Sequence, residues 1–294
     1  MIVSASYRTD IPAFHSRWFL SRLAAGFARV RNPYGGGTYE VSLHLGEVTA
    51  FVFWTRHMQP LMAALPEIAQ RAPFMVQFTI TGYPRALEPG VIDLAAALAQ
   101  FRDLSLRWGP HAAVWRYDPI LISSLTPAEW HLQNFARIAS ALAHRTNEAV
   151  LSFADPYRKS KRNLDLSARR HGFVWRDPEL QEKRALLEGL AAIARAEGMR
   201  ATLCTEPTLL QPGIEAARCV DAGRLSEIAG RPVLARERGN RPGCLCAESR
   251  DIGAYDTCTQ GCVYCYAVSS RTRAQARLKA INPEAEELGV GRVS

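Results

Sequence analysis

The chain has no long hydrophobic run and no leader pattern. Across its 294 residues no apolar stretch approaches the roughly 20 residues needed to cross a bilayer. It begins with MIVSASYRTD, where no basic segment precedes a long apolar stretch, so the N-terminus does not read as a secretory signal. Internal repeats and low-complexity tracts are absent too, which excludes repeat architectures. We therefore expect a cytoplasmic protein without a membrane partner.

Common nucleotide and histidine patterns are also missing. The glycine run NPYGGG, residues 32–37, has neither the lysine of a P-loop nor a Rossmann spacing, so it indicates a flexible turn. The seven histidines are scattered without ligand spacing and are interpreted as structural. Acidic residues are the minority, 28 against 36 basic ones, for a formal net charge of +8. This surplus favours polyanionic partners but specifies no reaction.

Cysteine is the informative residue. Seven is an odd number, and the cytoplasm keeps thiols reduced, so metal ligation is favoured over a disulfide framework. Three of the cysteines, Cys258, Cys262 and Cys265, have the spacing C-x3-C-x2-C, and Gly261 between them gives the backbone the freedom that a tight wrap needs. Three thiolates can hold an iron–sulfur cluster but leave one of its four positions without a protein ligand. Such an open position can bind and react with another molecule.

A simpler interpretation of the same triplet is a structural zinc site or a closed cluster that borrows a fourth cysteine. Four cysteines remain outside the triplet, and four is the number of ligands that a closed cluster or a zinc ion requires. We therefore predict a second metal site, although ordinary buried cysteines are the alternative. Its ligands would be Cys204, Cys219, Cys244 and Cys246.

The triplet resembles the cluster loop of radical S-adenosylmethionine (SAM) enzymes. The segment GCVYCYA, with Tyr264 just before the last cysteine, looks most like the spore photoproduct lyase, or DNA repair photolyase, branch. Beyond the loop, most of the chain resembles an uncharacterised bacterial family, domain of unknown function 1848, which carries no established reaction. In radical SAM enzymes the loop follows the first barrel strand, whereas here it comes last. The resemblance therefore implies a circularly permuted barrel, or a different use of the cluster.

The resemblance also implies a chemistry. The open iron of a [4Fe-4S] cluster would chelate SAM, and Tyr264 would lie against the adenosyl group. Arg8, which lies just past the first predicted strand, is a further cofactor-binding candidate. An electron from a donor such as a flavodoxin or ferredoxin would cleave SAM to a 5′-deoxyadenosyl radical, which abstracts hydrogen from the substrate.

Apolar strand patterns alternate with helical ones about six times, which argues for parallel strands and an α/β fold. A closed eightfold barrel takes about 250 residues and more units than these, so we predict a partial (β/α)6-type parallel barrel. Residues 1–235 would form it, and residues 236–294 would be a cysteine-rich iron–sulfur segment packed on it. That segment would supply one strand near residues 250–255 and a helix over residues 270–280, and the tail after Pro283 would be loosely held.

Polar residues follow several of the predicted strands, at the edge where α/β proteins build their sites. Arg116 with Asp118, in WRYDPI, is the first catalytic candidate, because a basic group suits an anionic ligand and a carboxylate can bind ribose or an amine. Asp10 is the third catalytic candidate. Arg56, Asp155 and Glu206 occupy similar positions, and each by itself is more typical of a solvated or ion-paired residue.

The sequence thus predicts a radical SAM enzyme acting on an unknown substrate, for which a nucleotide or nucleic acid is the first choice. The alternative is a non-catalytic iron–sulfur or zinc protein that binds nucleic acid, with Cys244 or Cys246 closing the triplet. An electron carrier or redox sensor is a third class, for which the chain is larger than needed.

Overall fold

The chain is organised around one eight-stranded parallel sheet. The structure, a computed structural model, describes residues 1–33, 35–155 and 157–290. The strands lie in the order β11-β10-β8-β6-β5-β4-β1-β12, and every neighbouring pair is parallel. Their bounds are β1 Ile2–Ala5, β4 Ala50–Thr55, β5 Phe74–Thr79, β6 Ala113–Ile120, β8 Glu148–Phe153, β10 Arg200–Leu203, β11 Ile214–Ala216 and β12 Ser249–Asp251.

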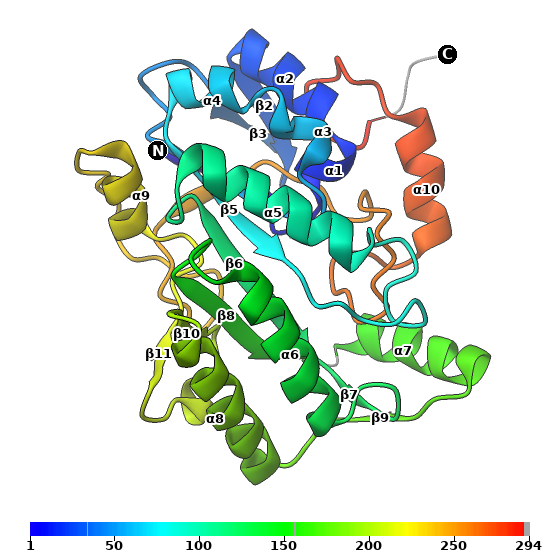
Figure 1. The fold of residues 1–294 in the computed structure, drawn as a ribbon. Helices are drawn as coiled ribbons and strands as arrows, with labels where there is room; N and C mark the ends of the chain where they lie inside the picture. Colours follow the sequence, from blue (N-terminus) through cyan, green and yellow to red (C-terminus); the bar gives the residue numbers. More distant parts are fainter. Residues whose placement is uncertain (34, 156, 291–294) are drawn as a thin grey trace.

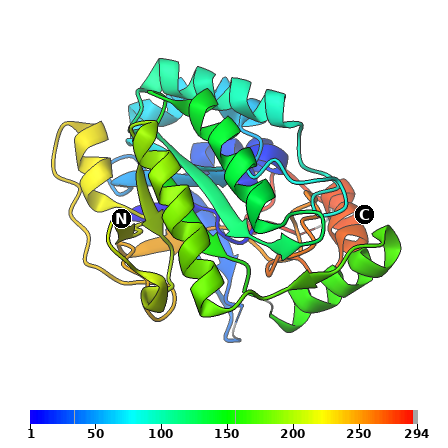
Figure 2. The same ribbon diagram turned by 60° about the horizontal axis from the view of Figure 1, so that its bottom comes forward.

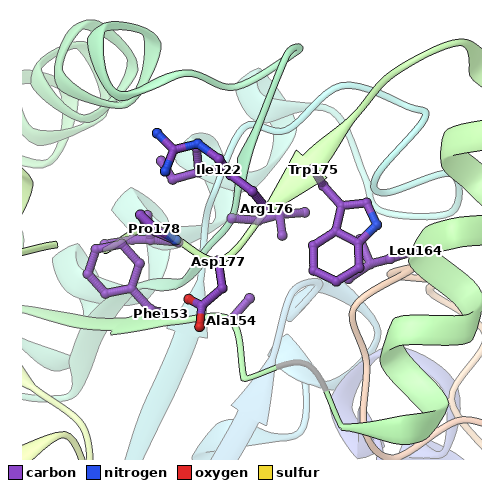
Figure 3. Close-up of a pocket in the computed structure, with 10 residues that line it drawn as sticks. Ile122, Phe153, Ala154, Leu164, Trp175, Arg176, Asp177 and Pro178 are labelled. Carbon is purple, nitrogen blue, oxygen red and sulfur yellow. The ribbon is translucent and has the colours of Figure 1, made fainter. Parts of the chain in front are cut away.

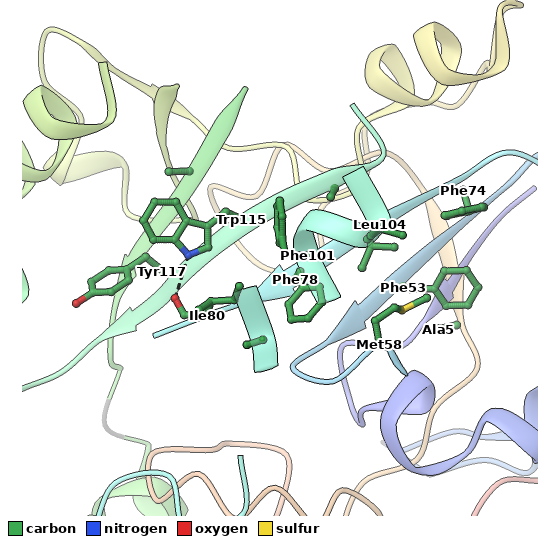
Figure 4. Packing of buried hydrophobic residues seen from close by; sticks show 14 of the residues in the cluster. Ala5, Phe53, Met58, Phe74, Phe78, Ile80, Phe101, Leu104, Trp115 and Tyr117 are labelled. Atoms are coloured by element: carbon green, nitrogen blue, oxygen red, sulfur yellow. Dashed lines mark hydrogen bonds between the residues drawn. The ribbon is translucent and has the colours of Figure 1, made fainter. Parts of the chain in front are cut away.

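The strands are buried on both faces, so successive side chains enter two different cores. On the first face lie Phe51, Phe53 and Trp115, and on the second lie Val52 and Val114. Figure 4 shows the aromatic part of the first core, where the Trp115 indole donates to the Ile80 carbonyl over 2.9 Å. Because of this alternation, polar strand residues can contact one another only when they lie on the same face of the sheet.

Helices cover the first face (Figure 1). Long helices α5, α6 and α8 pack along one another and against β6, β8 and β10, while shorter helices cover β1 and β4. Their bounds are α1 Ile11–Phe14, α2 Ser16–Ala25, α3 Gln59–Met62, α4 Leu65–Arg71, α5 Leu94–Trp108, α6 Ala128–Leu142 and α8 Leu180–Ala196. No helix in the described ranges is both long and apolar enough to cross a membrane.

The second face is covered mainly by the chain between β11 and β12. This segment contributes α9 (Ala222–Ala229) and buried side chains such as Cys219, Val220 and Cys246 to the second core. Gln77, on β5, donates from its amide to the Cys219 carbonyl over 2.8 Å and so ties the segment to the sheet. The cysteines of the segment therefore face the sheet.

The prediction of an α/β chain with parallel strands is confirmed. The cysteine-rich segment supplies a strand as expected, β12, and this strand pairs with β1, with Val3 opposite Arg250. The helix expected over residues 270–280 is α10, Arg271–Ala280. The sheet also gains β11, a three-residue strand with too short an apolar pattern to be predicted, and in the described residues β11 and β12 are its two edges.

Smaller elements complete the fold. Strands β2 (Phe27–Arg31) and β3 (Thr38–Ser42) form an antiparallel hairpin around the glycine run, of which Tyr34 lies outside the described residues. The basic stretch after β8 forms helix α7 (Arg158–His171), which precedes β9 (Trp175–Arg176), the partner of β7 (Ile122–Ser123). A short 3-10 helix, Pro207–Leu209, follows β10.

The prediction of a loosely held tail after Pro283 is wrong for the described part. The Trp18 indole donates to the Ala285 carbonyl over 2.8 Å, and the Arg29 amide donates to the Glu286 carbonyl over 2.9 Å. Leu288 is 3% exposed, within the first core. The anchors are backbone carbonyls, which leave no mark in the sequence.

Candidate functional site

The cysteine loop follows β12 and lies at the carboxyl edge of the sheet, against the loops that follow β1, β4 and β5. Gln260 donates from its amide to Asp10 over 2.9 Å, and the Thr257 hydroxyl donates to Thr9 over 2.9 Å. On the β5 side, the Val263 amide donates to the Leu87 carbonyl over 3.1 Å. The topology therefore brings a loop near the C-terminus to the first residues of the chain.

The backbone at Gly261 has φ +78°, a conformation that favours glycine, and an added Cβ would lie 2.5 Å from the Arg271 side chain. The role predicted for this glycine thus has a structural basis. Arg271, in the first turn of α10, donates to the Thr259 carbonyl over 3.2 Å. The helix after the loop helps to hold the turn between the first two cysteines.

The three thiols of the loop are partly buried and interact electrostatically. Burial raises the pKa of Cys262 to about 12 and raises the pKa values of Cys258 and Cys265 as well. Backbone amides stabilise sulfur here, since the Ala267 amide donates to Cys265 Sγ over 3.3 Å. Buried thiols of this kind become thiolates only when a cation is close.

The Tyr264 side chain is buried beside the triplet and is bonded at its hydroxyl. Arg56 donates from Nη2 to this hydroxyl over 2.7 Å and from Nη1 to Glu88 over 2.8 Å, and the hydroxyl itself donates to Glu88. Burial lowers the pKa of Arg56, but Glu88 and Tyr264 outweigh that effect and raise the pKa above its ordinary value. A permanent positive charge therefore lies next to Cys262.

Asp10 is fully enclosed and holds several elements together. It accepts hydrogen bonds from the Ala13 amide, the Thr55 hydroxyl, the Arg56 amide and the Gln260 amide group, over 2.7 to 3.0 Å. Burial raises the pKa of its carboxyl group even so. With four donors already on its two oxygens, Asp10 is arranged to position the cysteine loop.

Arg8 lies between two tyrosine rings, 5.5 Å from the centroid of Tyr7 and 5.7 Å from that of Tyr255. Its Nε is 3.6 Å from an Asp251 oxygen and, among the described residues, has no hydrogen-bond partner. Arg8 and Thr257 border a cavity of about 390 Å³ that lies beside the residues preceding Cys258. The cavity reaches the predicted cofactor-binding arginine, although none of the three cysteines borders it.

Arg116 and Asp118 face the second core, as the strand alternation requires. Arg116 donates from Nε and Nη2 to Asp118 and from Nη1 to Cys219 Sγ over 2.9 Å. Burial raises the pKa of Asp118, but Arg116 outweighs it and the pKa is lowered. Arg56 lowers it further, so Asp118 feels a charge that also binds Tyr264. The predicted catalytic pair thus lies between the triplet and the other cysteines.

Those other four cysteines are also brought together. Cys204 Sγ and Cys219 Sγ are 3.6 Å apart, and hydrogen-bond contacts continue from Cys219 to Cys246 and from Cys246 to Cys244. Cys204 directly follows β10, Cys219 follows β11, and the other two precede β12. Because these four cysteines come from distant parts of the sequence, their spacing does not predict that they meet; only their number suggests a common site.

Two strand-end candidates lie away from the triplet. Asp155 is exposed, while Glu206 accepts from the Phe153 amide over 2.7 Å, and burial raises its pKa to about 7. Sequence reasoning missed Glu88 and Gln260. Glu88 lies in the loop after β5, which contains no motif, and Gln260 lies within the cysteine motif but is not one of its defining residues.

A small pocket beside β7 and β9 (Figure 3) is lined by apolar groups such as Phe153 and Trp175, and its Asp177 is paired with Lys183 over 2.7 Å.

No three histidine, cysteine, aspartate or glutamate side chains in residues 1–33, 35–155 and 157–290 surround a point where one metal ion could sit. A cluster distributes its thiolates over different irons, so its ligands spread more widely than those of a single ion. The triplet offers soft sulfur donors in one loop, amides that donate to sulfur, and burial that makes a cation favourable. These residues fit an iron–sulfur cluster.

Fold and site together define an α/β protein whose parallel sheet carries a cysteine loop at its carboxyl edge. Residues 2–267 match the family model described as domain of unknown function (DUF1848), and because the match covers most of the chain, the chain belongs to that family. No curated protein and no solved structure matches it.

Proposed function

We propose that the chain is a radical SAM enzyme that holds an open [4Fe-4S] cluster on Cys258, Cys262 and Cys265. The observation that carries the proposal is the position of the cysteine loop. It leaves the sheet from β12 and lies on the loops after β1 and β4, held by Gln260 on Asp10 and by Tyr264 on Arg56. This is the edge at which parallel α/β proteins place their sites.

The strand order supports a circular permutation. Strand β12 is at the edge of the sheet and β1 is its neighbour. Counted from that edge, the sheet begins with β12, and the cysteine loop follows its first strand, as it does in radical SAM enzymes. This strand and the cysteine loop come last in the chain but first in the sheet. A circularly permuted partial barrel would have this arrangement.

When bound, the cluster would supply one electron to SAM and so generate the 5′-deoxyadenosyl radical that abstracts hydrogen. The chain's own residues would position SAM. Arg8, which borders the cavity and forms an ion pair with Asp251, is assigned to the carboxylate of SAM, and Tyr264 to the adenosyl side. Asp118, kept ionised by Arg116, is assigned to a ribose hydroxyl or amine. Asp10 and Arg116 position these groups.

For the substrate we propose a nucleic acid or nucleotide. Two basic helices, α7 and α10, lie on the same side of the molecule as the cysteine loop in both ribbon views (Figures 1 and 2), and Arg162 of α7 donates to the Ser269 carbonyl just before α10 over 3.2 Å. The half-exposed side chains of Tyr157, just before α7, and Tyr266, in the cysteine loop, have ring centroids 6.5 Å apart. Basic side chains with exposed rings suit a phosphate backbone and its bases.

Anaerobic reconstitution with iron and sulfide tests the proposal. With SAM and a reductant such as dithionite, flavodoxin or ferredoxin, the wild-type protein is expected to form 5′-deoxyadenosine, and SAM is expected to alter the electron paramagnetic resonance spectrum of the reduced cluster. The Cys262→Ser variant should do neither. An intact cluster that forms no 5′-deoxyadenosine and ignores SAM would contradict the proposal.

That outcome would favour the non-catalytic iron–sulfur or zinc protein that binds nucleic acid. Its proposed fourth ligand, Cys244 or Cys246, is in contact with the other sulfurs of the second group. Binding to single-stranded DNA that weakens steeply with salt, together with a spectrum that SAM leaves unchanged, would support it.

A further inference from the structure

Four thiols outside the cysteine loop meet on the second face of the sheet. Cys204 comes from the end of β10, Cys219 from the turn after β11, and Cys244 and Cys246 from the segment before β12. From these contacts we infer that they bind one tetrahedral metal ion, best matched by zinc, at a structural site separate from the radical SAM cluster. The inference does not depend on the proposed reaction.

Sulfur spacing favours one ion over a second cubane cluster. At a Zn–S bond of about 2.3 Å, two sulfurs on one tetrahedral zinc lie about 3.8 Å apart. The Cys204 and Cys219 sulfurs are 3.6 Å apart. A cubane cluster binds each thiolate through a different iron and holds its sulfurs further apart. The observed pair, joined here by a hydrogen bond between the two thiols, therefore already has a spacing compatible with ligands that share one ion.

The four sulfurs follow one another as a chain from Cys204 through Cys219 and Cys246 to Cys244. As the structure stands, no three of these sulfurs surround a point where one ion could sit. To surround an ion, the cysteines at the ends of this chain must turn about their Cα–Cβ bonds, which is a change between staggered rotamers. Both end residues lie in loops and are partly exposed, whereas the two central ones are buried in the second core. The movement is therefore confined to the two partly exposed side chains.

Positive charge is already arranged for thiolates. Arg116 donates to Cys219 Sγ over 2.9 Å, and Arg241 donates to Cys204 Sγ over 3.9 Å. Four thiolates with one divalent ion carry two negative charges, of which the Arg241 guanidinium offsets one, while the charge of Arg116 is already paired with Asp118. Neutral thiols would be poor acceptors for either arginine. The same arginines would thus act as the outer partners that orient metal ligands.

Backbone amides complete the surroundings of the sulfurs. The Val220 amide donates to Cys246 Sγ over 3.4 Å, and the Cys246 and Asn240 amides bond to the Cys244 sulfur. An ion here would join three separate segments and hold the chain between β11 and β12 across the sheet. It would also fix Arg116, the residue that positions Asp118.

Metal analysis of the purified full-length chain tests the inference. The wild-type protein is expected to hold about one zinc per chain. A Cys258→Ser, Cys262→Ser, Cys265→Ser variant should keep that zinc and lose cluster iron, while Cys204→Ser with Cys219→Ser should lose the zinc. Because the second variant could misfold, the triple variant stripped with a chelator is also titrated with cobalt, which should saturate near one equivalent with sulfur charge-transfer absorption.

The outcomes separate the two sites. Zinc in the triple variant, with or without 5′-deoxyadenosine formation by the wild type, supports the inference independently of the proposed function. Iron and sulfide in the triple variant would overturn it in favour of a second cluster. Stripped protein that takes up no cobalt, or a Cys204–Cys219 disulfide found after anaerobic purification, would overturn it in favour of plain thiols.

Discussion

The Arg56 guanidinium donates to the Tyr264 hydroxyl over 2.7 Å, although the two residues are 208 positions apart in the chain. Arg56 directly follows β4, and Tyr264 lies inside the cysteine motif. Both bind Glu88, from the loop after β5, so three separate loops share one buried ionic contact. This contact anchors the cysteine loop at Tyr264, between its second and third cysteines.

Replacing Arg56 should unsettle this contact strongly. Arg56→Met leaves Glu88 buried without its cation, and we expect a loss of about 3–5 kcal/mol in the free energy of unfolding. Tyr264→Phe removes only hydrogen bonds and should cost about 1–3 kcal/mol. Urea denaturation of both variants and of the double variant measures the coupling between the two side chains, expected to be at least about 0.5 kcal/mol.

The matched control is Arg107→Met, which breaks the surface pair of Arg107 with Asp103 on α5. Exposed pairs at this spacing contribute about 0.3–0.5 kcal/mol, so this variant should stay close to the wild type. Equal losses in Arg56→Met and Arg107→Met would show that the Arg56 contact is not a buried one.

Gln260 provides a second attachment of the loop, through Asp10. Gln260 is 3% exposed and donates to Asp10 over 2.9 Å, so Gln260→Ala removes one bond to a buried carboxylate and should cost about 1–3 kcal/mol. The looser loop should also retain less iron after reconstitution than the wild type, as measured by metal analysis after gel filtration.

Gln133→Ala serves as its control, because Gln133 makes a similar bond to Glu129 on the exposed face of α6. It should change neither stability nor iron content. If Gln260→Ala kept full iron content, the loop would not depend on Asp10 for its position.

The parts of this fold that follow from local pattern could be predicted, and those that depend on distant contacts could not. Apolar runs such as AFVFWT and EAVLSF predict strands because parallel strands that are buried on both faces have nearly continuous hydrophobic sequences. Strand β12, with only three residues, was predicted because a barrel needs a strand before its cysteine loop. Strand β11 is equally short but has no motif beside it, and it was missed.

The candidate site divides in the same way. The C-x3-C-x2-C spacing and Tyr264 single out the loop, because its three cysteines are close together in the chain. Arg56, Glu88 and Asp10 meet the loop only through the order of strands in the sheet. Arg116 is predicted to act on a ligand, and the fold also turns one of its donors toward Cys219, 103 residues away.

The tail after Pro283 offers a prediction about stability. Leu288 is buried in the first core, and Leu288→Ala should lower the free energy of unfolding by about 2–4 kcal/mol, because deleting a buried Leu leaves a cavity. Leu234→Ala is the matched substitution at an 88% exposed position and should stay within about 0.5 kcal/mol of the wild type. Equal effects in thermal and urea denaturation would mean that the tail does not pack in solution.

His131 predicts how stability depends on pH. Its ring is buried between the Tyr117 hydroxyl, 2.9 Å from Nδ1, and the Leu121 carbonyl, 3.0 Å from Nε2. Burial lowers its pKa to about 4, from an ordinary value of 6.5. Between these two values the unfolded chain binds the proton and the folded protein does not. Stability is therefore complete above pH 6.5 and falls as the pH drops toward 4.

This one histidine should remove about 1.6 kcal/mol between pH 6.5 and pH 5, from the relation between pKa shifts and free energy. His131→Gln keeps a donor for Leu121 but has no group that titrates, so its stability should fall less over that range, even if it is less stable at pH 7. His15, with a pKa also lowered to about 4 by burial, contributes equally to both proteins and cancels in the comparison. Parallel pH profiles of urea denaturation for the two proteins would show that folding does not lower the pKa of His131.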